Sequence, residues 1–136
     1  MRTAELRERF ASCPVARLAT VRPDGAPHLV PVVCAVSADT VWFAVDAKPK
    51  RTTRLQRLTN LRNDPRCALL ADHYEEDWRR LWWVRADGVA TVVDEPGADH
   101  PGVAALVERV GQYRAAPPAG PLVVVRVERW SGWSGS

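Results

Sequence analysis

Hydrophobic residues change their spacing after the first dozen positions of the chain. Leu6 and Phe10 are four residues apart within a charged stretch, which predicts a short amphipathic helix. The next three apolar segments, 15–21, 28–36 and 40–46, are rich in β-branched and aromatic residues and are separated by turn-forming clusters. This order predicts a helix followed by a three-stranded antiparallel meander.

Pro31 interrupts the second of these strands. Proline has no backbone N–H, so a strand that contains it lies at a sheet edge or is bulged at that point. Either arrangement leaves backbone groups of this strand free to contact something other than a neighbouring strand.

A second helix is expected to begin at Thr52 or Thr53 and to end before Pro65. At about 100° per residue, three leucines form its apolar face, Arg54 falls inside that face and Arg57 borders it. An arginine on an inward face needs an anionic partner or a water-filled cleft, because an unpaired buried charge is costly. The amide side chains fall on the opposite side of the helix: Gln56, Asn60 and Asn63.

The second half of the chain continues the strand pattern. Segments 67–74 and 81–94 have strand character, with a polar connection between them, and Gly88 is expected to mark a bulge or a close approach. Helical spacing of valine and leucine predicts a helix at 101–113, and a last strand follows at 122–130 before a tail of small residues. We therefore expect a single domain over residues 1–136: a small antiparallel barrel decorated by short helices.

Positive charge is concentrated in one stretch, 48–66. It holds seven of the nineteen Lys and Arg residues and one of the sixteen Asp and Glu residues, so it carries +6 while the rest of the chain carries −3. Lys48, Lys50 and Arg51 stand just before a predicted helix N-terminus, where unpaired N–H groups and the helix dipole favour an anion, and Thr52 adds a hydroxyl donor. This combination predicts a phosphate site, with a solvated charged surface as the alternative.

Several other functions are disfavoured by the sequence. The basic stretch contains no aromatic residue, and neither an RNA-binding aromatic pattern nor a helix-turn-helix is visible, so nucleic acid is not the expected partner. The chain has no hydrolase or nucleotide-hydrolysis motif. It also has no apolar run long enough for a membrane span, and its charged start is unlike a secretion signal. We expect a soluble, cytoplasmic protein.

Cysteine and tryptophan usage adds two expectations. Cys13, Cys34 and Cys67 are odd in number and fit no metal-ligand spacing, which predicts reduced, buried thiols and no metal site. Six tryptophans are present, and Trp82 and Trp83 are adjacent on a predicted strand, so their side chains point to opposite faces. One is expected in the core and the other in a groove or against a partner.

Four segments resemble the pyridoxamine 5′-phosphate oxidase-like (PPOX) class of split β-barrel proteins, which bind flavins and deazaflavins. They are RLATVRPDGAPHLVPV (17–32), VWFAVDAKPKR (41–51), LRNDPRCALL (61–70) and LWWVRADGVATV (81–92). The pattern of Asp77 and Trp78 followed by Leu81 to Gly88 is similar to the small actinobacterial branch that uses coenzyme F420.

This resemblance implies a mainly β fold: a split β-barrel of about six antiparallel strands with short decorating helices. It also implies a homodimer with two cofactor sites at the subunit interface. The phosphate contacts of the family carry over to Lys48, Lys50, Arg51 and Thr52, with Arg57 as a further contact to the phosphate or the tail.

The ring system of the cofactor is implied to lie against the backbone of the second strand, at Val30, Pro31 and Val32. A glutamine that touches the flavin in the oxidase branch is replaced here by Trp83, which we carry over as a cofactor contact. That replacement speaks against oxidation of pyridoxamine phosphate. The resemblance implies hydride transfer from F420 to a small organic acceptor. The cofactor would then carry the chemistry, which explains why no acid–base pair stands out in the sequence. The alternatives are an FMN-dependent oxidoreductase and a non-catalytic binder of a flavin-like or haem-like ligand.

Overall fold

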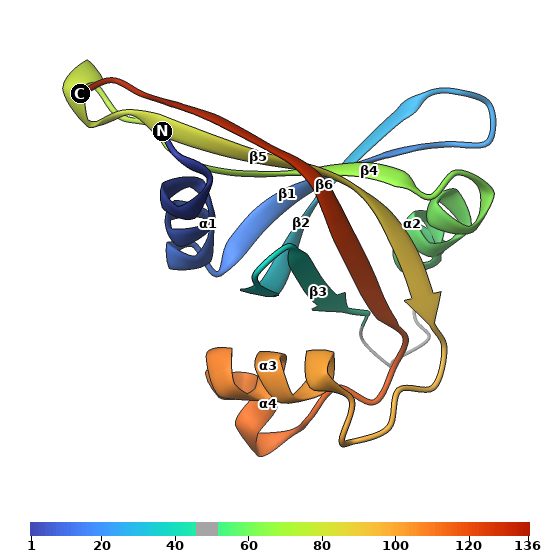
Figure 1. Cartoon of the computed structure of the whole chain (residues 1–136). Helices are drawn as coiled ribbons and strands as arrows, with labels where there is room; N and C mark the ends of the chain where they lie inside the picture. The colour runs from blue at the N-terminus through green and yellow to red at the C-terminus, as the bar shows by residue number, and fades with distance from the viewer. Residues whose placement is uncertain (46–51) are drawn as a thin grey trace.

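The computed structural model describes residues 1–45 and 52–136, with side chains described from residue 56 onward in the second range. Its strands form a closed antiparallel barrel in the order β1-β2-β3-β6-β5-β4 (Figure 1). The predicted barrel of about six antiparallel strands is thus confirmed. The strands are β1 (Val15–Val21), β2 (Pro27–Ser37), β3 (Thr40–Ala44), β4 (Arg66–His73), β5 (Trp82–Val93) and β6 (Leu122–Ser134).

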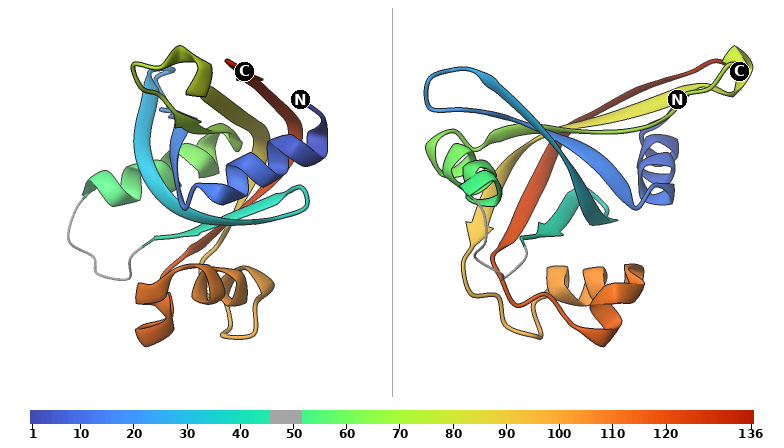
Figure 2. Two further views of the ribbon diagram at one scale, coloured as in Figure 1. Left: turned by 90° about the vertical axis from the view of Figure 1, so that its left-hand side faces the viewer. Right: turned by 180° about the vertical axis from the view of Figure 1, so that it is seen from behind.

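Short helices surround the barrel. Figure 2 shows α1 and α2 on opposite sides of the strands, with α3 and α4 packed together at one end. None of the helices that the structure describes is long and apolar enough to cross a membrane. The helices are α1 (Thr3–Ser12), α2 (Thr52–Asn63), the 3₁₀ turn η1 (Trp78–Arg80), α3 (Pro101–Arg109) and α4 (Gly111–Ala115).

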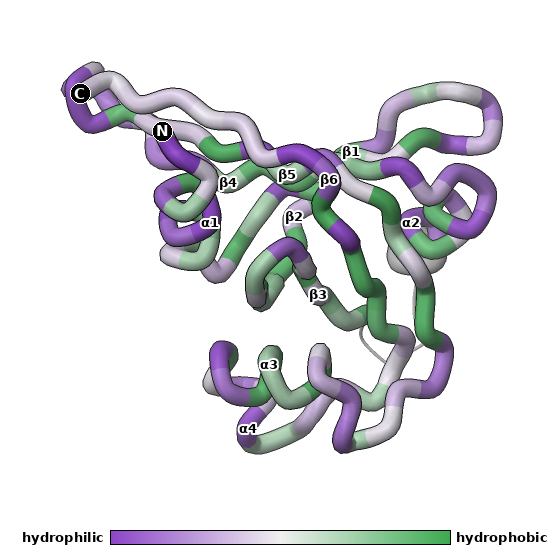
Figure 3. The backbone as a smooth tube through the Cα atoms, in the orientation of Figure 1, coloured by the Kyte–Doolittle hydropathy of each residue, from purple (hydrophilic) through white to green (hydrophobic). Residues whose placement is uncertain are grey.

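The main core fills the barrel, and hydrophobic residues follow the strands that enclose it (Figure 3). Alternate residues of each strand point inward, as Ala16, Leu18 and Thr20 do on β1. Helix α1 closes one side with Leu6 and Phe10, and the Phe10 ring meets Trp130 edge-on at 5.4 Å between centroids.

A second, smaller core lies outside the barrel, between the sheet and α3. Trp42 of β3 packs there against Val103 and Leu106 of α3. Helix α3 comes so close that a Cβ atom on Gly102 would lie 2.5 Å from Cδ1 of Trp42. Glycine at this position therefore allows the helix to rest directly on the indole ring, which is held in place by the contact.

Asp39, in the turn between β2 and β3, ties three distant elements together. Its Oδ1 accepts hydrogen bonds from Nε of Arg7 on α1 (2.9 Å) and from the indole N–H of Trp130 on β6 (2.9 Å). The hydrogen bond from Trp130 and those from Arg7 hold the pKa of Asp39 below its ordinary value. Protonation of this carboxylate would loosen α1 from the barrel.

Most predicted elements are confirmed, and two are corrected. The helix expected at 101–113 is interrupted, because Val110 has extended backbone angles between α3 and α4. The residues expected to form a tail continue β6 instead, and Trp133 pairs with Trp83 of β5. Gly88 does mark an irregularity in the β5–β6 ladder, where a Cβ atom would lie 2.4 Å from the Arg126 carbonyl oxygen.

Candidate functional site

The strand edge at Pro31 is open. Strand β2 pairs with β1 over Pro27–Val33, whereas its described pairing with β3 covers only Cys34–Ser37. The Cys34 N–H donates to the Pro14 carbonyl at 3.0 Å, and because antiparallel bonds alternate along a ladder, the Pro31 carbonyl turns away from β1 toward the open edge. The predicted edge position of Pro31 is confirmed, and its register with β1 is unbroken, so no bulge is present.

A cavity of about 190 Å³ lies at this open edge, and we call it the edge cavity. It is formed by the middle of β2, the end of β3, one side chain of α2 and one of α4. Arg57, which is half-buried, is the only charged residue among the described residues of its lining. The lining residues are Pro31, Val32, Val33, Ala44, Val45, Arg57 and Tyr113.

The edge cavity brings together three of the predicted site residues, Pro31, Val32 and Arg57. Val30, also predicted, is half-buried and packs against the main core. Lys48, Lys50 and Arg51 lie outside the described residues. Thr52 is the first residue of α2, as predicted from its capping character, and its side chain is not described.

Trp83 lies elsewhere, in a shallow cavity of about 520 Å³ on the outer face of the sheet, which we call the outer groove. Trp82 packs against the main core, so the two tryptophans do face opposite sides. The register places Trp83 three strands from the Pro31 region of β2, or about 14 Å at the usual strand spacing. The structure therefore does not bring Trp83 to the edge cavity within one subunit. The outer groove is lined by Arg17, Ala19, Leu29, Ala68, Leu70, Asp72, Tyr74, Trp83 and Arg85.

A layer of buried polar side chains lies between α2 and the β1–β2 hairpin. The amide of Asn60 donates to Oγ1 of Thr20 at 3.0 Å and its oxygen accepts from Gln56 at 2.6 Å. Asn60 is fully buried, so its predicted position on the outer side of the helix is wrong. These two hydrogen bonds satisfy the amide and make burial favourable, and no apolar pattern in the sequence signals them.

His28 lies beside this polar layer, and no pattern in the sequence signals its surroundings. It pairs with Thr20 across the β1–β2 ladder, and its Nδ1 atom is buried without a hydrogen-bond partner among the described residues. Burial, and then the positive charges of Arg22 and Arg57, lower the pKa of His28 below its ordinary 6.5. The positive charges of these two arginines therefore favour the neutral form of the imidazole.

We expect acid to destabilise the protein through His28. Because the folded-state pKa is lowered, the unfolded chain binds more protons once the pH falls below about 6.5, and the free energy of unfolding decreases there. His28→Gln should remove this part of the pH dependence. Urea unfolding at about pH 7.5 and about pH 5.5 measures it, since these values bracket the histidine range. Equal losses of stability in wild type and variant would contradict the assignment.

The cysteines differ in burial. All three cysteines are free, Cys34 and Cys67 are buried as predicted, and Cys13 is partly exposed. Burial raises the pKa of both Cys34 and Cys67 to about 12, so both remain neutral at physiological pH. Within residues 1–45 and 52–136, no cluster of His, Cys, Asp or Glu is arranged to hold a metal ion.

Comparison with known proteins identifies the family. The family model described as pyridoxamine 5'-phosphate oxidase matches residues 3–134. The chain belongs to this family. Its closed barrel and open β2 edge are therefore features of a pyridoxamine 5'-phosphate oxidase-like protein, as the four sequence segments indicated.

Solved structures with the same fold differ in what they are described as binding. A conserved hypothetical protein from Mycobacterium tuberculosis is 28% identical, with a TM-score of 0.78 over 99% of this chain and 86% of that one. A FAD-binding protein from Mesorhizobium loti is 20% identical (TM-score 0.73; 97% and 94% covered). HutZ, a haem storage protein from Vibrio cholerae, is 17% identical (TM-score 0.72; 98% and 95% covered). No curated protein matches the chain.

Proposed function

We propose that this pyridoxamine 5'-phosphate oxidase-like protein is a homodimeric oxidoreductase that uses the deazaflavin F420 to reduce a small organic acceptor. The observation that carries the proposal is the edge cavity, where Arg57 meets the open backbone edge of β2. The cavity also lies at Val45, directly before the basic segment that contains Lys48, Lys50 and Arg51.

The edge cavity suits the phosphate end of such a cofactor. A guanidinium can bind phosphate through two parallel hydrogen bonds, and the first residue of α2, Thr52, stands at a helix N-terminus that favours an anion. The open carbonyl edge at Pro31 offers a hydrogen-bond acceptor, and Val33 and Ala44 offer apolar surface. Arg57, the basic segment and the β2 edge would therefore hold the cofactor.

A bound deazaflavin supplies the hydride, and the protein binds, orients and shields it. The described residues fit that division, because none of those that line the edge cavity is a carboxylate or a histidine. Arg57 would fix the anionic end, and the apolar residues around it would exclude water from the ring. The acceptor is a small molecule whose identity no described residue determines.

A second subunit is needed to complete such a site. Ligand pockets for molecules of this size usually measure roughly 300–1,000 Å³, which the edge cavity does not reach. The outer groove offers the surface for a partner: Leu29 is 68% exposed and Tyr74 61% exposed there. A contiguous apolar patch of this kind commonly marks a protein interface. We therefore propose that two copies associate through the outer groove, where Trp83 of one copy approaches the cofactor of the other.

Two alternatives follow from the same fold. One is an FMN-dependent oxidoreductase, and the other is a non-catalytic binder of a flavin or haem. The second is favoured by the relatives described as FAD-binding and haem storage proteins.

Fluorescence titration of the purified protein with F420, FMN and haemin separates these functions. We expect saturable tryptophan quenching by F420 in the micromolar range and at least tenfold weaker binding of FMN and haemin, about 1.4 kcal/mol or more of discrimination. Reoxidation of reduced F420 by a panel of quinones then tests the enzyme. Tight binding of haemin without F420 binding would contradict the proposal, and F420 binding with no acceptor reduced would indicate a carrier.

A further inference from the structure

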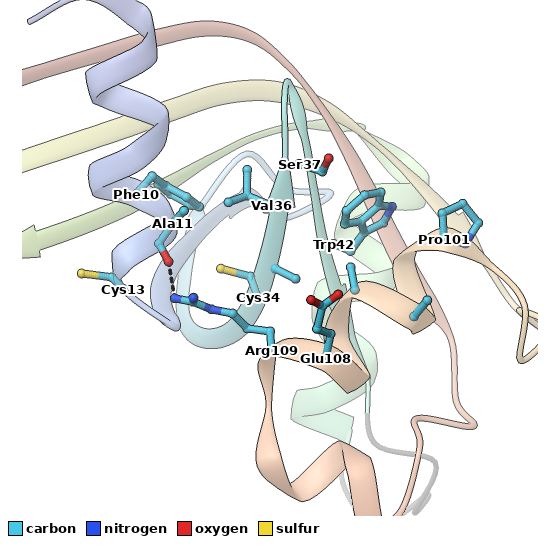
Figure 4. A pocket seen from close by; sticks show the side chains of 13 residues that line it. Phe10, Ala11, Cys13, Cys34, Val36, Ser37, Trp42, Pro101, Glu108 and Arg109 are labelled. Atoms are coloured by element: carbon cyan, nitrogen blue, oxygen red, sulfur yellow. Dashed lines mark hydrogen bonds between the residues drawn. The ribbon is translucent and has the colours of Figure 1, made fainter.

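A cavity larger than the edge cavity lies elsewhere in the described structure. It has a volume of about 710 Å³ and lies between α1, the β2–β3 hairpin and α3 (Figure 4). We call it the α1–α3 cavity. It shares no lining residue with the edge cavity or with the outer groove, so the proposed cofactor and dimer sites leave it unused.

Two aromatic residues that line the α1–α3 cavity are fixed by packing elsewhere. Phe10 is fully buried and held edge-on against Trp130, and Trp42 is held by the close approach of Gly102. Cys34 contributes a neutral thiol to the floor. Because these residues are locked by the two cores, the cavity does not depend on a ligand for its shape.

The rim of the cavity carries one cation and one carboxylate, both from α3. Arg109 extends across the opening and donates a hydrogen bond to the Ala11 carbonyl at the end of α1 (Figure 4). No carboxylate lies within ion-pair distance of Arg109 among the described residues, so its only hydrogen-bond acceptor there is a neutral carbonyl. Glu108 is the single acidic residue of the lining.

This distribution of charge selects a type of ligand. A guanidinium bonded to a neutral carbonyl gains from exchanging that partner for an anion, because charge-assisted hydrogen bonds are stronger. Glu108 balances the charge of the lining, which disfavours molecules with several negative charges. The apolar part of the lining, which includes Trp42, Val36 and Pro101, favours an aromatic body. The volume lies in the range of small-molecule sites.

We propose that the α1–α3 cavity is a second ligand site, which binds a monoanionic aromatic molecule with its carboxylate or sulfonate on Arg109 and its rings against Trp42. This site is independent of the cofactor, and it stands whether or not F420 binds at the edge cavity.

The test uses 2-naphthoate as a probe and its neutral analogue 2-naphthalenemethanol, titrated into the full-length ¹⁵N-labelled protein and followed by NMR. We expect saturable shifts of Cys34, Ala35, Trp42 and Ala104 signals with 2-naphthoate below about 1 mM, and at least tenfold weaker binding of the neutral analogue. Arg109→Gln keeps a hydrogen-bond donor for Ala11 but removes the charge, and should weaken 2-naphthoate about tenfold. Ala104→Phe, at the exposed rim, should block both probes.

Arg114→Gln is the matched control, because Arg114 donates to the Glu108 carbonyl from α4 and does not line the cavity. It should bind 2-naphthoate like wild type. The proposal is overturned if 2-naphthoate shows no saturable shift up to about 1 mM, if its shifts map to the outer groove instead, or if Arg109→Gln and wild type bind it equally. The spectrum of each unliganded variant shows whether it is folded. The Ala104→Phe variant tests the cavity even if the Arg109 variant does not fold.

Discussion

Replacing Arg57 with glutamine is expected to weaken cofactor binding at least tenfold while leaving the barrel folded. Arg57 is the one charged side chain that the structure describes in the lining of the edge cavity. A hydrogen bond to a charged group contributes about 1.5–3 kcal/mol net, and each 1.4 kcal/mol is a factor of ten in affinity. Glutamine keeps a hydrogen-bond donor and part of the apolar side chain, so the loss of cofactor affinity measures the contribution of the positive charge. Fluorescence titration with F420 measures it.

Arg62→Gln provides the control for this variant. Arg62 belongs to the same helix, is exposed, and forms a surface ion pair with Asp94. Such pairs contribute little, so F420 affinity and stability should stay near wild type. The double variant Lys50→Ala with Arg51→Ala tests the predicted basic turn separately. If the Arg57 variant binds F420 as tightly as wild type, the edge cavity is not the phosphate site. If the double variant binds F420 as tightly as wild type, the basic turn is only a charged surface.

The second large effect is expected from Leu29→Arg, which should convert the proposed dimer into monomers and abolish cofactor binding with it. Burying a leucine is worth about 1.5–3 kcal/mol, and a two-fold interface contains the residue twice. The introduced cation would also lie near Arg17 and Arg85 in the outer groove. Dimer dissociation should therefore increase at least a hundredfold, which light scattering after size-exclusion chromatography detects.

Thr91→Arg introduces the same side chain at an exposed strand position outside the outer groove, and it should remain dimeric. If Leu29→Arg also remains dimeric, the outer groove is not the interface. If it is monomeric but binds F420 normally, the edge cavity is complete within one subunit. In that last case the second subunit does not complete the site, but F420 is still the cofactor.

The strand pattern made the fold predictable. Segments rich in β-branched and aromatic residues, separated by clusters of turn residues, indicated the strands and their order along the chain. Pro31 was informative for a different reason, since a missing N–H restricts a residue to an edge. Free backbone groups on β2, where the edge cavity lies, could therefore be predicted from the sequence.

Features that depend on tertiary partners were not predictable in the same way. Asn60 is buried because Thr20, forty positions earlier, accepts its hydrogen bond, and helical periodicity carries no information about such a partner. The last residues of β6 look like a flexible tail by composition, yet the β5 ladder extends to Ser134. The α1–α3 cavity is likewise formed by segments from both halves of the chain, which no local pattern joins.

Closure of the barrel has a kinetic consequence. The β3–β6 ladder pairs Thr40 with Arg126, so the chain must bring its first third and its end together before the last seam forms. Contacts between such distant segments are entropically costly and slow to form, and we expect this seam to limit the folding rate. The indole of Trp130 reaches Asp39 at the same seam. Its fluorescence should therefore change when the β3–β6 ladder forms and the barrel closes. The same change would mark the assembly of the edge cavity beside β3.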